Sequence, residues 1–182
     1  MEFEESFIKL LRENDKRAQK SFYQQLAPKM YGVCLRYASN SDDAADIMQE
    51  GFIRIFNHIK DFRGDGSFEG WVRRTMVNTA INYYRKSIKR GISAELKHVK
   101  EKADETPFVI DRMAADELIE LIKNLPDGYR TVFNLNIIEG YTHKEIGEML
   151  NISENTSKSQ LSRARVSLQK MINKITNKEN IE

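Results

Sequence analysis

The feature that most constrains the fold is the scarcity of residues that break helices. The 182-residue chain contains three prolines and nine glycines. Proline removes a helical hydrogen bond and glycine costs conformational entropy, so a chain with few of either can form long helices. Apolar residues also recur at steps of three and four along most of the chain, which is the spacing of one helix face. We therefore predict an all-α protein.

One long segment lacks this periodicity and divides the chain. Between residues 87 and 111 charged residues are frequent, Pro107 interrupts the chain and apolar spacing is weak, as is typical of a linker. Helical spacing resumes at Met113 and continues, after a break at Leu125-Pro126, into the C-terminal region. We predict two small helical domains, residues 1–88 and 113–176, joined by a flexible linker at residues 89–112.

In the N-terminal half, apolar spacing predicts four helices. A loop rich in glycine and aspartate, residues 61–70, separates the third helix from the fourth. Ser41 is the predicted N-cap of the third helix, because serine caps well and acidic residues follow it in the first turn. The fourth helix is predicted to bury one face, which carries Phe68, Trp71, Val72, Thr75, Met76, Thr79 and Tyr83.

The local distribution of charge, rather than the net charge, indicates where the chain could bind nucleic acid. The formal net charge is only +2 at pH 7, which does not indicate such a ligand. The side chains that are charged at pH 7 are all acidic in residues 41–51 and all basic in residues 73–90. A solvated basic helix end is the alternative interpretation of the second segment. The side chains predicted to be exposed on the fourth helix, opposite its core face, are Arg74, Asn78, Ile81 and Arg85, with Tyr84 nearby to stack on an unpaired base.

The C-terminal part contains the pattern of a helix-turn-helix. Thr142 and Glu145 form a capping box at the start of one helix, and Ser153 can cap the next one after a short break. Two helices joined by three or four turn residues form the motif in which the second helix enters the major groove of DNA. A plain helical hairpin with similar caps is the alternative.

The second helix of this pair has two distinct faces. Ser157, Leu161, Ala164 and Leu168 share a narrow arc that we predict to be buried. Lysine and arginine can contact phosphates or guanine edges, and serine lets a helix approach the groove closely. Arg165, Lys170 and Lys174 are expected to meet phosphates or solvent, and Lys158, Ser159, Ser162 and Arg163 to read bases. The side chains opposite the buried arc are Asn155, Lys158, Ser159, Ser162, Arg163 and Val166.

No pattern in the sequence indicates an enzyme. The three histidines, His58, His98 and His143, are scattered without zinc-binding spacing, and the glycines near residue 66 do not form a phosphate-binding loop. We predict no catalytic residue, no metal, no cofactor and no small-molecule substrate, and a solvent-exposed His143. Because signal-peptide and membrane-span patterns are not seen and the lone Cys34 lies in an apolar run, we expect a cytoplasmic protein without direct membrane insertion and with a buried structural thiol.

Taken together, three segments resemble the extracytoplasmic-function (ECF) group of the bacterial sigma-70 family. Residues 43–59 resemble the family's second conserved region, whose DxxQExF core stands here as Asp46, Gln49, Glu50 and Phe52. Residues 68–86 resemble the segment that follows it and binds the promoter −10 element. Residues 125–165 resemble the fourth region, which reads the −35 element.

The resemblance implies a function and a set of partners. The third helix would bind core RNA polymerase, at the clamp coiled coil of the largest subunit, through Asp46, Gln49, Glu50 and Arg54. The loop at residues 61–70 would lie against the non-template strand of promoter DNA, and an anti-sigma factor is an expected further partner. The expected −35 contacts are Asn155, Lys158, Ser159, Ser162 and Arg163. The expected −10 contacts are Asp65, Ser67, Phe68, Arg73, Arg74, Asn78, Tyr84 and Arg85.

Two positions depart from the family's pattern. Ser157 stands where many relatives have valine, so its hydroxyl faces the buried side of the helix, where it could bond back to a backbone carbonyl. Gln160 stands where a basic residue is common, so this departure affects the phosphate contact expected at the position.

The alternative function is a stand-alone helix-turn-helix regulator that acts as a dimer without polymerase. Such a regulator should carry a ligand pocket or a phosphoacceptor pattern in its N-terminal half. The sequence shows neither.

Overall fold

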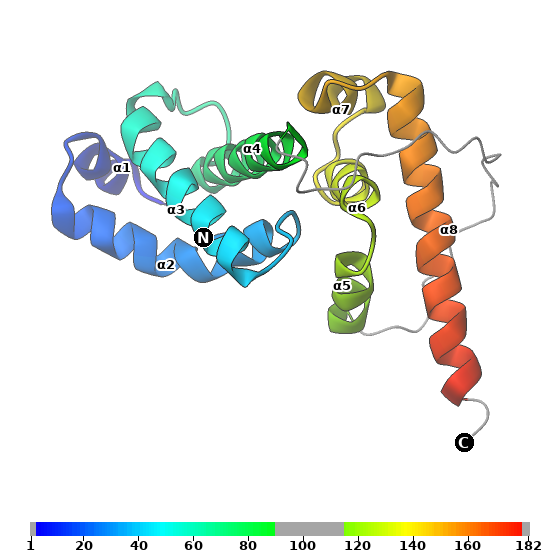
Figure 1. The fold of residues 1–182 in the computed structure, drawn as a ribbon. Helices are drawn as coiled ribbons and strands as arrows, with labels where there is room; N and C mark the ends of the chain where they lie inside the picture. The colour runs from blue at the N-terminus through cyan, green and yellow to red at the C-terminus, as the bar shows by residue number, and fades with distance from the viewer. Residues whose placement is uncertain (1–2, 90–114, 180–182) are drawn as a thin grey trace. The chain divides into compact units, whose positions relative to one another are not determined.

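The computed structural model describes residues 3–89 and 115–179, and within these ranges every regular element is a helix (Figure 1). The prediction of an all-α protein is therefore confirmed. Nearly all of the predicted linker, residues 90–112, lies outside the described residues. In the described part of the chain, no helix is long and apolar enough to cross a lipid bilayer.

The chain forms two compact units. The first contains a 3₁₀ turn, η1, and four α-helices. Their bounds are α1 Glu5–Arg12, α2 Lys16–Leu35, α3 Ser41–His58, η1 Ile59–Asp61 and α4 Phe68–Lys89. The second contains a π-helical turn, η2, and four α-helices. Their bounds are α5 Ala115–Lys123, α6 Asp127–Phe133, η2 Asn134–Ile138, α7 His143–Leu150 and α8 Glu154–Glu179.

The core of the first unit lies where α2, α3 and α4 pack against one another. Phe22 of α2 is fully buried there, and its ring contacts those of Phe52, Phe56 and Phe68 at centroid distances of 6.1, 5.8 and 5.6 Å. Aromatic pairs at these distances stabilise a core beyond the effect of burial alone. The aromatic cluster therefore connects all three helices.

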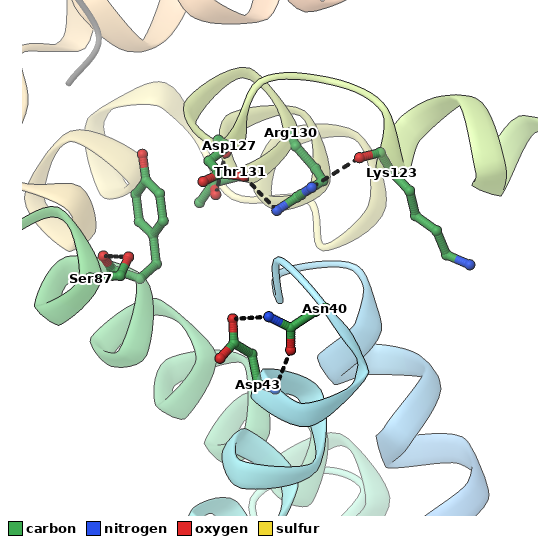
Figure 2. Close-up of polar contacts among 8 residues, drawn as sticks. Asn40, Asp43, Ser87, Lys123, Asp127, Arg130 and Thr131 are labelled. Carbon is green, nitrogen blue, oxygen red and sulfur yellow. Dashed lines mark hydrogen bonds and ion pairs between the residues drawn. The ribbon is translucent and has the colours of Figure 1, made fainter. Parts of the chain in front are cut away.

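Asn40, rather than the predicted Ser41, is the N-cap of α3. The Asn40 side-chain oxygen accepts a hydrogen bond from the backbone N–H of Asp43 at 2.8 Å, and its amide donates to the Asp43 carboxylate at 3.2 Å (Figure 2). Asn40 has the extended backbone that a cap requires, and asparagine caps as well as serine, so the helix begins one residue before the predicted position. The Tyr83 hydroxyl donates to Asp43 at 2.5 Å and thereby joins α4 to the start of α3.

The predicted core face of α4 is buried along most of its length, but the buried arc is wider than predicted. Phe68, Val72, Met76 and Thr79 are buried, and the other predicted core residues of α4 are half-buried. Ile81, predicted to be exposed, is also buried. The reason is that α4 packs against both α2 and α3, so a single stripe of apolar residues does not define its interior.

A buried arginine fixes the corner between α5 and α6 in the second unit. Arg130 is 5% exposed, and its guanidinium donates to the Lys123 carbonyl at 2.9 Å and to the Asp127 carboxylate at 2.8 Å (Figure 2). A buried charge is tolerated when it is paired and hydrogen-bonded in this way. Arg130 therefore holds α6 against the end of α5, across the break at Pro126 that the sequence predicts.

The helix predicted to end near Gly140 contains a π-helical turn. After α6 the chain widens into η2, and Gly140 follows with a φ of 79°. A glycine in this left-handed conformation is the usual way to end a helix. The long helix α8 packs on α5, α6 and α7, so it contacts each of the other α-helices described in the second unit (Figure 1).

Candidate functional site

The first helix of the helix-turn-helix begins with the predicted capping box. The Thr142 hydroxyl accepts from the Glu145 backbone N–H at 3.3 Å, and the Glu145 carboxylate accepts from the Thr142 backbone N–H at 2.8 Å. These bonds satisfy two donors that a helix start leaves unpaired. Hydrogen bonds from Thr142 also lower the pKa of Glu145, so the carboxylate is charged at neutral pH.

The turn between α7 and α8 is tight and specifically built. Asn151 has a left-handed backbone with a φ of 57°, and the Ile152 N–H donates to the Gly147 carbonyl at 3.0 Å. The Ser153 hydroxyl accepts from the Thr156 N–H at 3.0 Å, which confirms the predicted cap of α8. Gly147 is buried under this turn, and a Cβ at that position would lie 2.9 Å from the Ile152 carbonyl oxygen.

We expect the substitution Gly147→Ala to destabilise the second unit. Glycine to alanine in a helix interior ordinarily stabilises by about 1 kcal/mol. Here the new methyl group meets a backbone oxygen that moves only with the turn, so a net loss of about 1–3 kcal/mol is expected. Amide hydrogen exchange of α7 and α8 should accelerate accordingly, while that of α2 stays unchanged.

Gly32→Ala provides the matched control for this prediction. Gly32 lies within α2, is exposed, and has no atom within 4 Å of a Cβ position. We expect this variant to be as stable as the parent protein or more so. Equal protection of α7 and α8 in the parent and in Gly147→Ala would show that the turn relaxes without cost.

The buried arc predicted for α8 is confirmed, but the polar group within it has an unpredicted partner. Ser157, Leu161, Ala164 and Leu168 are all buried. The Ser157 hydroxyl lies 2.9 Å from Nδ1 of His143 on α7, so it bonds across the two helices rather than back to a carbonyl.

The environment of His143 follows from this contact. The side chain is half-buried, so the prediction of a solvent-exposed His143 is wrong. Burial is the main cause that lowers the pKa of His143, and the positive charges of Lys158 and Arg165 lower it further, while Glu154 opposes them. The imidazole is therefore neutral at pH 7 and bridges the two helices as a hydrogen-bonding group.

Gln160 is also buried, contrary to the expectation that this position bears on phosphate contact. It is 3% exposed, and its side-chain oxygen has no hydrogen-bond partner among the described residues. At about 100° per residue, Gln160 lies about 40° beyond Ala164 on the helix circumference, next to the predicted buried arc. The position of Gln160 on the helix circumference therefore favoured burial, whereas its polar side chain suggested exposure.

The residues predicted to contact the −35 element lie together on the opposite side of α8. Asn155 and Lys158 are exposed, and Ser159, Ser162 and Arg163 are half-buried. The Ser159 hydroxyl donates to the Thr156 carbonyl at 2.9 Å, while the Lys158 ammonium pairs with Glu154 at 2.7 Å. The two basic side chains thus stand beside short hydroxyl side chains, which leave room for a base edge.

The residues predicted to bind polymerase share one face of α3. Asp46 and Gln49 are exposed, and the side chains of Glu50 and Arg54 pair with each other at 2.5 Å while each remains 38% exposed. Their spacing of three and four residues aligns them along the helix. Arg54 balances the charge of Glu50. Asp46 has no ion pair among the described residues and therefore supplies the net negative charge of this group.

Most of the predicted −10 contacts are accessible on the loop and on α4. Asp65 and Ser67 are exposed. Asp65 lies between Gly64 and Gly66, and Ser67 follows Gly66; the φ angles of the two glycines are 85° and 91°. On α4 the three residues Arg74, Asn78 and Arg85 are exposed, as predicted, and Arg73 is half-buried.

Two predicted −10 contacts are instead buried. Phe68 is 5% exposed and packs between the rings of Phe62 and Trp71, at centroid distances of 5.0 and 5.9 Å. Tyr84 is 7% exposed, so the expectation that its ring is free to stack on an unpaired base is wrong. Phe68 belongs to the aromatic core that α4 forms with its neighbours. The exposed residues around Phe68 and Tyr84 remain the candidates for DNA contact.

Comparisons with known proteins match a sigma factor region to each of the two units. The model for Sigma-70 region 2 matches residues 22–90, and the model for Sigma-70, region 4 matches residues 115–168. The chain is 30% identical over 176 residues to the ECF RNA polymerase sigma factor SigW of Bacillus subtilis (strain 168), covering 91% of this chain and 94% of SigW. This chain belongs to the ECF sigma factors of the sigma-70 family.

Other sigma factors match over similar lengths. The chain is 28% identical over 180 residues to the ECF RNA polymerase sigma-E factor of Haemophilus influenzae, covering 93% of this chain and 95% of that protein. The structure of the sigma factor RpoE in complex with the anti-sigma factor NepR from Bartonella quintana matches with a TM-score of 0.51 and 20% identity. That match covers 85% of this chain and 98% of the Bartonella chain, and it concerns the fold.

Sequence reasoning missed one exposed residue of the α3 face of this sigma factor. Ile53 is 53% exposed and lies seven residues after Asp46 and three after Glu50, so helical spacing places it among them. The signal was the position of Ile53 on the helix.

Proposed function

We propose that this ECF sigma factor binds core RNA polymerase with its first unit and reads promoter DNA with both units, directing promoter-specific transcription initiation. The observation that carries the proposal is the second helix of the helix-turn-helix. It buries its apolar arc and leaves Lys158 and Arg163 exposed or half-exposed beside serine hydroxyls. The predicted limits of the functional domains, residues 1–88 and 113–176, are part of the proposal.

For the −35 element, we assign base reading to the exposed face of α8. Lys158, Ser159, Ser162 and Arg163 are the base-reading candidates, and Asn155 lies one turn earlier on the same face. A bidentate contact between arginine and guanine discriminates against another base by about 1–3 kcal/mol. Lys158 must leave Glu154 to reach DNA, so we assign Arg163 the larger share of the specificity.

For the −10 element, we assign strand capture to the loop before α4 and to the exposed basic side of that helix. The loop residues Asp65 and Ser67 would meet a base turned out of the duplex, because flanking glycines permit close approach. Arg73, Arg74 and Arg85 would bind the backbone by charge, and Asn78 would offer an amide. Phe68 and Tyr84, whose side chains are buried, would support this surface.

For core polymerase, we assign binding at the clamp coiled coil to the α3 face. Asp46, Gln49, Glu50 and Arg54 would supply polar and charged contacts, and Ile53 an apolar one at the centre. An acidic surface suits a basic partner. Polymerase would hold both DNA-reading units at once and so raise the effective concentration of each, so neither needs tight binding alone.

An anti-sigma factor is the second protein partner that we propose. The Bartonella sigma factor of similar fold was solved with such a partner. In this chain the partner would cover the α3 face or the DNA-binding faces, which must be exposed for initiation. We further propose that the protein acts in the cytoplasm without bond chemistry of its own, since capture and recognition alone account for the predicted sites.

The proposal is tested by transcription with purified core polymerase and fragmented genomic DNA, with and without this protein, followed by sequencing of transcript starts. We expect discrete new starts that share two upstream elements. If no new starts form and the protein binds DNA without polymerase, the stand-alone regulator becomes the better account.

A further inference from the structure

The short helix α1 contacts the base of the loop that precedes α4, although it lies before the residues matched by the region 2 model. Arg12, the last residue of α1, donates a hydrogen bond from its guanidinium to the Phe62 carbonyl at 2.9 Å, across 50 residues of sequence. Its other terminal nitrogen pairs with Glu5 at 2.5 Å. The Arg12 side chain is only 28% exposed, against 71% for Glu5, so the contact with Phe62 is the more protected of the two.

An aromatic cluster forms the base from which this loop projects. Phe62 and Phe68 stand at the two ends of the loop with their ring centroids 5.0 Å apart, and both are buried. Phe3, just before α1, packs its ring edge against Phe68 at 5.7 Å. The segment that includes α1 therefore reaches the base of the loop at two points, through the ring of Phe3 and the guanidinium of Arg12.

The loop itself has little to fix its conformation. Residues 63–67 are all exposed, and Gly64 and Gly66 adopt left-handed backbone conformations that few other residues share. The hydrogen bonds of the segment lie at its ends, where the Phe62 N–H donates to Ile59 and the Ser67 hydroxyl accepts from Gly70. The conformation of the exposed residues therefore depends on how firmly these ends are held.

We propose that Arg12 is a positioning residue for −10 recognition, because its bond to the Phe62 carbonyl fixes the start of the exposed loop. This inference rests on the proposed role of the loop in binding the −10 strand. A loop held in its binding conformation loses less entropy when it captures a base, which favours both affinity and discrimination. Arg12 acts through the loop and does not itself contact DNA.

The first measurement concerns the loop without DNA. Trypsin cleaves after Arg63, which lies within the exposed segment, so the rate of that cleavage in the native protein reports how often the loop opens. In Arg12→Ala we expect this cleavage to accelerate by roughly tenfold, as for the loss of a charge-assisted hydrogen bond. Arg12→Lys keeps the charge and should give an intermediate rate. Arg17→Ala removes the same charge from an exposed position of α2 and should leave the rate unchanged.

The second measurement concerns promoter opening by the holoenzyme. Permanganate reactivity of −10 thymines is compared on a promoter found by the transcription experiment and on versions with single −10 substitutions. We expect Arg12→Ala to reduce discrimination between these promoters by severalfold, roughly in proportion to the loosened loop. Arg12→Lys should recover part of it, and the affinity for core polymerase should not change.

Two results would overturn the inference. Unchanged cleavage after Arg63 in Arg12→Ala would mean that Arg12 does not hold the loop. Faster cleavage with unchanged −10 discrimination would mean that holding the loop does not matter for recognition. The double variant Asp65→Ala, Ser67→Ala distinguishes these two results from a failure of the proposed function. If that variant still discriminates fully between the promoters, the loop does not read the −10 element, and the proposed role of the loop fails independently of Arg12.

Discussion

Replacing Lys158 and Arg163 together by alanine is expected to lower transcription from this sigma factor's own promoters by at least about thirtyfold. Both side chains project from the face of α8 opposite its buried arc, where base edges and phosphates would lie. Two lost contacts of about 1 kcal/mol or more each account for that factor. Transcript yield from the promoters found with the parent protein measures the effect.

The matched control for this prediction is Lys170→Ala combined with Lys174→Ala. These lysines are exposed on the same helix beyond the proposed reading face, and the pair removes the same charge. We expect transcription within about twofold of the parent. The loss of salt-sensitive affinity for DNA should be smaller than in the variant that lacks Lys158 and Arg163. An equal loss in both double variants would show that net charge, and not the reading face, drives binding to DNA.

The single variants should differ in a defined order. Lys158 pairs with Glu154 at 2.7 Å, and both side chains are about half exposed. Binding to DNA breaks this pair, which is weak because both groups are solvated, so a small part of what Lys158 gains from DNA is offset. Within residues 3–89 and 115–179, Arg163 forms no ion pair with a carboxylate, so Arg163→Ala should cost more than Lys158→Ala.

The helix-turn-helix shows which parts of a site can be predicted from sequence. The capping box of Thr142 and Glu145, the cap at Ser153 and the buried arc of α8 follow from local spacing, and the structure contains each of them. Gln160 was misjudged because its polarity outweighed its position on the helix. The bond between Ser157 and His143 was missed because it joins two helices, and a pattern within one helix does not contain it.

The first unit shows why long-range contacts limit such predictions. The periodicity of α4 predicts one buried face, but α4 packs on two neighbouring helices and its buried arc is wider, so that Ile81 is buried as well. The bond from Arg12 to the Phe62 carbonyl joins segments 50 residues apart, and nothing in either segment specifies the other. Exposure of Arg74, Asn78 and Arg85 was predictable, since these residues lie where no neighbouring helix packs.

Reversing two charges on α3, with Asp46→Lys and Glu50→Lys, is expected to weaken binding to core polymerase by about a hundredfold or more. Like charges placed across a protein interface cost several kcal/mol, which corresponds to that factor. The fold should survive, because Asp46 is exposed and the pair of Glu50 with Arg54 is a partly exposed contact between neighbouring turns. Fluorescence anisotropy of labelled sigma factor titrated with core polymerase measures the change.

The control for this second prediction is Glu13→Lys combined with Glu117→Lys. Both glutamates are exposed, one lies in each unit, and the pair changes net charge by the same amount. We expect nearly parental polymerase affinity in the control. Loss of α3 function should silence every promoter at once, whereas loss of Lys158 and Arg163 should leave polymerase affinity intact and silence only promoters that depend on the −35 element. If the α3 variant keeps full polymerase affinity, polymerase binding must lie on another surface of the first unit or on the second unit.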